Sequence, residues 1–96
     1  DKVVPRDGVY AVKVFLGDND IYKGMLNIGT NPTFSNLERS IEVNILNFKR
    51  DIYTEKVSIH FVERIRDEIK FSSVEELVAQ LEKDKETSIR ILNSSE

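Results

Sequence analysis

A glutamate within a predicted strand has the clearest potential for acid–base chemistry in this sequence. Glu42 lies between Ile41 and Val43, and the alternation of β-branched and polar residues continues to Ile45. This period of two predicts a strand with two different faces, and Glu42 lies on the face opposite the three β-branched residues. A polar loop that starts at Gly29 precedes the strand. A carboxylate placed in this way can act as a general base, and it can equally be an ordinary exposed glutamate.

The elements that would position Glu42 are mostly strands. Runs rich in β-branched and aromatic residues predict four of them, at residues 9–16, 21–28, 40–47 and 56–65. The connections are of hairpin size and leave no room for crossover helices, so we expect antiparallel pairing. The connection at residues 29–39 is polar and long for a simple hairpin, and loops of this kind are frequently functional.

One helix is predicted over residues 74–92. Ser73 and Glu76 form a capping box at its start, and Ser72 with Glu75 gives the alternative register. Apolar residues at helical spacing follow, and we expect this stripe to pack against the sheet: Val74, Leu77, Val78 and Leu81.

Composition restricts the class of protein. The chain has 96 residues, 40% of them hydrophobic and 32% charged, which is typical of one small globular domain. A net charge of −3 gives no basic face for nucleic acid, and the absence of cysteine removes disulfides and thiolate sites. Because no apolar run reaches membrane-spanning length and no signal-peptide pattern is present, we expect a cytoplasmic protein without membrane or nucleic-acid partners.

Several motifs in order give the sequence a resemblance to a known family. These are PRDGVYAV, NIG-x-x-PTF, IEV-x-IL-x-F with D-x-Y, and IRDEIKF before the predicted helix. Together they resemble the riboflavin kinase domain, which forms the C-terminal half of bacterial bifunctional riboflavin kinase/FAD synthetases. The resemblance covers roughly residues 4–92. It implies an all-β fold, a small antiparallel Greek-key β-barrel with one C-terminal α-helix, and phosphorylation of riboflavin to FMN by ATP.

The resemblance also assigns roles to particular residues. Glu42 matches the family's catalytic glutamate, which would accept the proton of a flavin ribityl hydroxyl. The nucleotide contacts would fall at Ile45, Asn47 and Tyr53. Thr54 stands where the family has a glycine after this tyrosine, and Tyr53 could instead pack at a barrel rim.

The flavin contacts implied by the resemblance fall just before the helix. Arg66, Lys70 and Phe71 match the family's flavin segment, since an aromatic ring and cations suit an isoalloxazine and a phosphate. Phe71 could also be a hydrophobic staple at the helix start. Asn27, Thr33 and Phe34 belong to a loop that would form a flap over the site or simply a hydrogen-bonded turn.

One family motif is missing. The resemblance implies a G-F-P-T-A-N segment that would precede Asp1 and whose Thr and Asn would hold Mg²⁺ and the ATP phosphates. We therefore expect residues 1–96 to be an N-terminally truncated riboflavin kinase-like domain, with no metal ligand of its own and with an adenylyltransferase domain N-terminal to it in the parent chain. The alternative function is a small barrel that binds a flavin or a partner without catalysis.

Overall fold

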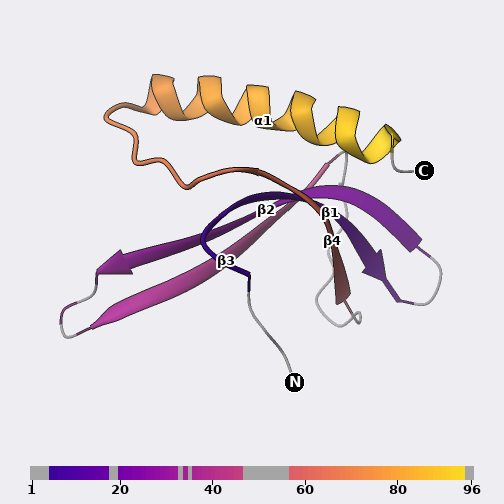
Figure 1. Cartoon of the computed structure of the whole chain (residues 1–96), viewed down its shortest axis with the longest axis horizontal. Helices are drawn as coiled ribbons and strands as arrows, with labels where there is room; N and C mark the ends of the chain where they lie inside the picture. The colour runs from indigo at the N-terminus through magenta and orange to yellow at the C-terminus, as the bar shows by residue number, and fades with distance from the viewer. Residues whose placement is uncertain (1–4, 18–19, 33, 35, 47–56, 95–96) are drawn as a thin grey trace.

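The computed structural model describes residues 5–17, 20–32, 34, 36–46 and 57–94. These residues form four strands and a helix: β1 (Gly8–Leu16), β2 (Asp20–Pro32), β3 (Leu37–Ile45), β4 (Val57–Arg66) and α1 (Val74–Ser94). The strands make one antiparallel sheet in the order β3-β2-β1-β4, and α1 lies across one side of it (Figure 1). This is the strand order of a Greek key, in which the fourth strand returns to lie beside the first.

The predicted antiparallel sheet, its Greek-key order and the C-terminal helix are confirmed. In the ladders of the described residues, β3 and β4 are the two edges of the sheet. The expected long loop at residues 29–39 is wrong in extent, because β2 and β3 continue to pair through it as far as Pro32 and Leu37. A side chain from the lead-in segment contacts the ends of both strands.

Asp7 makes those contacts. Its carboxylate accepts a hydrogen bond from Thr30 Oγ1 at 2.5 Å and pairs with Arg39 Nη2 at 2.8 Å. The next residue, Gly8, has a φ of 152°, and a Cβ there would lie 2.8 Å from the carbonyl oxygen of Arg66. The lead-in is therefore fixed to β2 and β3, and it lies close against the end of β4, where the predicted flavin segment begins.

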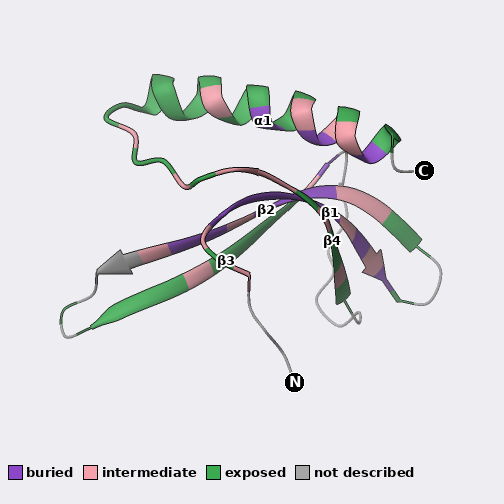
Figure 2. Cartoon of the chain, in the orientation of Figure 1, coloured by how far each residue is buried: buried purple, intermediate pink, exposed green. Residues whose placement is uncertain are grey.

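The hydrophobic core lies on the face of the sheet away from α1, here called the inner face. Its fully or nearly buried members come from β1 and β2: Tyr10, Val12, Val14, Leu16, Leu26 and Ile28. In Figure 2 the buried residues concentrate on these two central strands, whereas β3 and β4 are mostly exposed or intermediate. The core therefore belongs mainly to the two central strands, with Tyr22, Ile45 and Ile59 packed against it.

The helix covers the opposite, outer face. Val9, Ala11 and Met25 alternate with the core residues and are buried on that side. Lys23, on the same face as Met25, donates to the side chain of Asn93 near the end of α1. The helix therefore covers this face through contacts with β1, β2 and β4.

The prediction that the apolar helical stripe packs against the sheet is wrong. Val74, Leu77, Val78 and Leu81 are between 38% and 72% exposed. The buried helix positions are Asp84, Ser88 and Leu92, four residues apart in the C-terminal half. Two of them are polar, so the apolar pattern did not mark them. The stripe belongs instead to the first turns of α1, which lie farther from the sheet than the last turns do (Figure 1).

The helix start agrees with the capping prediction. Ser73 Oγ accepts a hydrogen bond of 3.1 Å from the backbone N–H of Glu76. The Glu76 carboxylate returns to Ser72, from which it accepts bonds of 3.2 Å from the backbone N–H and 2.9 Å from Oγ. The Ser73–Glu76 register is thus confirmed, with the return bond displaced by one residue.

Candidate functional site

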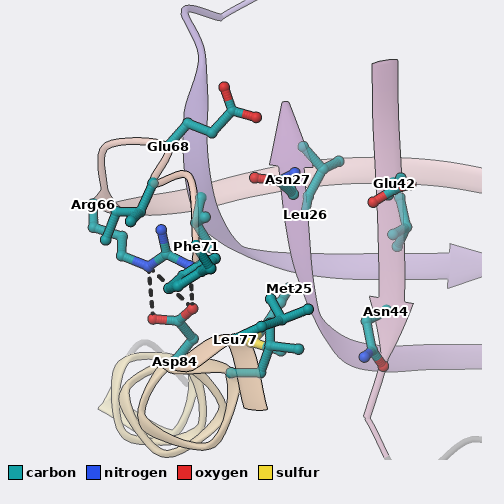
Figure 3. A pocket seen from close by; sticks show the side chains of 14 residues that line it. Met25, Leu26, Asn27, Glu42, Asn44, Arg66, Glu68, Phe71, Leu77 and Asp84 are labelled. Carbon is teal, nitrogen blue, oxygen red and sulfur yellow. Dashed lines mark hydrogen bonds and ion pairs between the residues drawn. The ribbon is translucent and has the colours of Figure 1, made fainter. Parts of the chain in front are cut away.

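A cavity of about 360 Å³ lies between α1 and the outer face of β2 and β3 (Figure 3). The segment at residues 66–71, which joins β4 to the helix, forms another wall. Cavities that hold small molecules commonly measure about 300–1,000 Å³, with mostly apolar walls and a few polar groups. This cavity has that character, because Met25, Phe71, Leu77 and Leu81 line it together with a small set of polar side chains.

Glu42 and Asn27 are brought to the cavity by the register of two strands. They are directly opposite each other in the antiparallel ladder, as are Asn44 and Met25 two positions along. Directly opposite residues project to the same face, so all four line the outer-face cavity. The predicted orientation of Glu42, opposite to the β-branched residues of its strand, is confirmed. Glu42 is exposed and can meet a ligand in the cavity.

Arg66 is held at the cavity wall by a buried carboxylate. Its Nε lies 3.0 and 3.1 Å from the two oxygens of Asp84, and its Nη2 lies 2.6 Å from Oδ2 (Figure 3). Asp84 is 2% exposed and also accepts a bond of 3.0 Å from Gln80 Nε2. Arg66 Nη1 donates to the carbonyl of Asp67. Since a guanidinium has five N–H groups, this arrangement orients Arg66 and leaves donor capacity toward the cavity.

The rest of the segment divides between cavity and solvent. Phe71 lines the cavity together with Leu77, which lies in the first turn of α1. Lys70 is 69% exposed and pairs with Glu68 at 3.8 Å, and it is not part of the cavity wall. Of the three predicted flavin contacts, the structure therefore brings Arg66 and Phe71 together at the cavity and places Lys70 outside it.

Two other predicted site residues, Ile45 and Phe34, do not line the cavity. The side chain of Ile45 packs against the core cluster on the inner face. Phe34 is fully exposed. Thr33, Asn47 and Tyr53 lie outside the described residues, so the nucleotide contacts predicted at the last two remain predictions.

Three polar residues of the cavity were not assigned a role from the sequence: Asn44, Glu68 and Asp84. Asp84 lies where the apolar helical stripe fades, and an aspartate there looks like an exposed residue. Its partner, Arg66, is 18 residues away in sequence. The one available signal was the four-residue spacing of Gln80, Asp84, Ser88 and Leu92, which marks a single helix face.

Two features were sought in the described part of the chain and not found there. No group of three or more acidic or histidine side chains is placed to hold a metal ion among those residues. No helix among them is long and apolar enough to span a membrane.

Comparison with known proteins gives a consistent family. The family model for riboflavin kinase matches residues 1–92. The chain is 43% identical over 93 residues to a bifunctional riboflavin kinase/FMN adenylyltransferase of Haemophilus influenzae, and 41% identical over 95 residues to one of Bacillus subtilis. These alignments cover 97% and 96% of this chain but 30% of each relative, so the chain spans about a third of the relatives it matches.

A solved structure agrees with the fold. A crystal structure from Streptococcus pneumoniae, described as a macrolide-efflux protein, superimposes with a TM-score of 0.80 at 44% identity. The match covers 90% of this chain and 28% of the other.

Proposed function

The chain belongs to the riboflavin kinase family, and we propose that it transfers the γ-phosphoryl group of ATP to the 5′-hydroxyl of riboflavin. The observation that carries this proposal is the cavity itself, which combines a carboxylate on a rigid strand, Glu42, with an apolar wall that includes Phe71. A flavin needs such a combination, because its ring is flat and apolar and its reacting group is a hydroxyl at the end of a polar chain.

Glu42 would act as the general base. As the riboflavin oxygen forms a bond to the γ-phosphorus, the bond from that phosphorus to the bridging oxygen of ADP breaks, and the hydroxyl proton passes to the Glu42 carboxylate. The products are FMN, ADP and a protonated Glu42, which then releases its proton to water. The register that pairs Glu42 with Asn27 gives this carboxylate a fixed strand position, and its exposure lets a hydroxyl reach it.

Phe71 and Arg66 would hold the flavin. The Phe71 ring offers an apolar surface for the isoalloxazine, and Arg66, oriented by Asp84, offers N–H groups to an acceptor on the ligand. Lys70 lies beyond the cavity wall and pairs with Glu68, so its predicted contact with the flavin rests on the resemblance alone.

The ATP side of the site rests on the family alone. We expect Asn47, Tyr53 and the backbone at Ile45 to contact the nucleotide, and Thr33 with Phe34 to form a flap. Mg²⁺ would accompany ATP, but the described residues do not supply a ligand set for it, so no step is assigned to the metal. The relatives' bifunctional names suggest that the kinase module works beside an FMN adenylyltransferase domain, in the cytoplasm where ATP is available.

The second candidate, a barrel that binds flavin without catalysis, shares the same apolar wall. Turnover separates the two. In the protein as the cell makes it, Glu42→Gln should lower kcat by about 10²–10⁴-fold, the usual contribution of a general base, with little change in the affinities for riboflavin and ATP.

A matched control is available on the same strand and face. Glu38 is exposed four residues from Glu42 and does not line the cavity, so Glu38→Gln should leave kcat unchanged. A Glu42→Gln enzyme with kcat within about threefold of the wild type would rule out the base assignment. A wild-type protein that binds riboflavin but never phosphorylates it would favour the binding module.

A further inference from the structure

Glu68 is a carboxylate at the cavity that the chemistry above does not use. Its side chain is 22% exposed, and it lines the cavity on the segment between β4 and α1. In the described part of the chain its contact with a cation is an ion pair with Lys70 at 3.8 Å, beyond hydrogen-bond distance. A largely covered carboxylate normally accepts hydrogen bonds, and those oxygens therefore have capacity for a donor that arrives with a ligand.

Gly29 makes room for this carboxylate. A Cβ at position 29 would collide with Glu68 Oε2 and would lie 2.9 Å from its carboxyl carbon. The Glu68 carboxylate thus lies against β2 at Gly29, on the same outer face as Asn27, which is two residues before Gly29. Positions two residues apart on a strand are separated by about 6.7 Å. Glu68, Asn27 and Glu42 therefore form a row of three polar side chains on the outer face, with Asn27 in the middle.

Three polar groups of the cavity lie in a row on its strand side, whereas Arg66 and Asp84 lie on the helix side near Phe71. Figure 3 shows Glu68, Asn27 and Glu42 in succession on the strand side, while Phe71 and Leu77 lie nearer the helix. Carboxylate oxygens accept hydrogen bonds, and an amide both donates and accepts. A row of this kind complements a chain of neighbouring hydroxyl groups, each of which can also donate and accept.

We propose that Glu68 accepts a hydrogen bond from a hydroxyl of the substrate's polyol chain and is a specificity-determining residue of the site. The inference rests on the proposed function, because it takes the terminal hydroxyl of that chain to lie at Glu42. The chain then runs past Asn27 toward Glu68, and the flavin ring occupies the apolar side beside Phe71 and Leu77. The ring carries one N–H of its own, which is the competing donor for Glu68.

Two ligands separate these donors. Riboflavin carries the ring and the polyol chain, whereas lumiflavin carries the same ring with a methyl group in place of the chain. The full-length protein would be titrated with each ligand, and binding would be measured from the change in flavin fluorescence. Glu68→Ala should weaken riboflavin binding by about 10- to 100-fold, the usual effect of losing a hydrogen bond to a charged group. Lumiflavin binding should change by less than about twofold.

Asp67 provides the matched control. It is the adjacent carboxylate, it is 86% exposed, and it pairs with Arg64 outside the cavity. Asp67→Ala should leave the binding of both flavins unchanged. Glu68→Gln, which keeps an acceptor but loses the charge, should recover part of the riboflavin affinity that Glu68→Ala loses.

Gly29 supplies an independent test. The added methyl of Gly29→Ala would meet only the far end of a flexible side chain, so the strand should stay folded while the Glu68 carboxylate moves. Riboflavin binding should weaken as in Glu68→Ala. Once Glu68 is alanine, Gly29→Ala should cost no further affinity, because the group that it displaces is absent. Circular dichroism of each variant would confirm that the fold is retained.

Each other outcome is decisive. Equal losses for riboflavin and lumiflavin in Glu68→Ala would move Glu68 to the ring N–H and overturn the polyol assignment. Unchanged riboflavin binding in Glu68→Ala would remove Glu68 from the site. A wild-type protein that binds neither flavin would overturn the proposed function itself, and this inference with it.

Discussion

The ion pair between Arg66 and Asp84 should contribute strongly to stability, and Asp84→Asn tests this. The substitution keeps the size of the side chain and removes its charge. Arg66, 16% exposed, would then lose the partner that makes three close contacts with it. Removing one member of a buried pair costs about 3–5 kcal/mol, because the remaining charge is left without compensation. Since Arg66 borders the cavity and is partly solvated, we expect about 3 kcal/mol.

That loss would be large for a domain of this size. Small domains are stable by about 5–15 kcal/mol, and each 1 kcal/mol shifts Tm by about 4–8 °C at 60–100 residues. Asp84→Asn should therefore lower Tm by roughly 12–24 °C in a thermal melt followed by circular dichroism. The control is Asp67→Asn, which breaks the exposed pair of Arg64 with Asp67 and should cost about 0–1 kcal/mol.

A double variant separates stability from ligand binding. Arg66→Met with Asp84→Leu replaces the pair by apolar groups, and such replacements are often neutral or stabilising by about 1–4 kcal/mol. The double variant should therefore regain the Tm that Asp84→Asn loses, yet bind riboflavin weakly because the guanidinium is gone. An Asp84→Asn protein that loses less than about 1 kcal/mol would refute the reasoning, since Arg66 would then be held by other contacts.

Two further predictions concern the fold. Leu92→Ala should cost about 2–5 kcal/mol in equilibrium denaturation because Leu92 is fully buried, whereas Leu77→Ala, 38% exposed at the cavity, should cost clearly less; equal losses would contradict the packing described for α1. Hydrogen bonds from Thr30 and Arg39 lower the pKa of Asp7 below its ordinary value of 3.8. Because the pKa is lower in the folded state, the charged carboxylate stabilises the fold fully at pH values above 3.8, and this stabilisation is lost as the pH falls below 3.8. The stability deficit of Asp7→Asn in urea titrations should therefore be constant at neutral pH and shrink below about pH 3.8.

Local patterns predicted the sheet well because its elements are specified locally. The alternation around Glu42 fixed which face that residue occupies, and the ladder confirms it opposite Asn27. The Ser73–Glu76 cap needed only neighbours within one helical turn. In each case the determining interactions lie within a few residues, or within one pair of strands, and a sequence displays them directly.

Contacts between distant segments were not readable in the same way. The partner of Arg66 is a polar residue on a helix face that carries little apolar signal, so neither the pair nor the buried face was predicted. The hydrogen bond that joins the lead-in segment to β2 links Asp7 with Thr30, 23 residues away. The assignments of Asn47 and Tyr53 rest on the resemblance and concern residues outside those described.

The misplaced helical stripe nevertheless bears on function. Leu77 and Leu81 are about 40% exposed, and both line the cavity beside Phe71. Apolar side chains left partly in water add little to folding stability, since the hydrophobic contribution scales with the area removed from water. A flat apolar ligand in the cavity would cover them and would bind the folded state alone, so ligand binding would stabilise the domain by mass action. Leu77 and Leu81 therefore contribute little to packing of the helix on the sheet, and they supply an apolar surface for a flavin at the start of the helix.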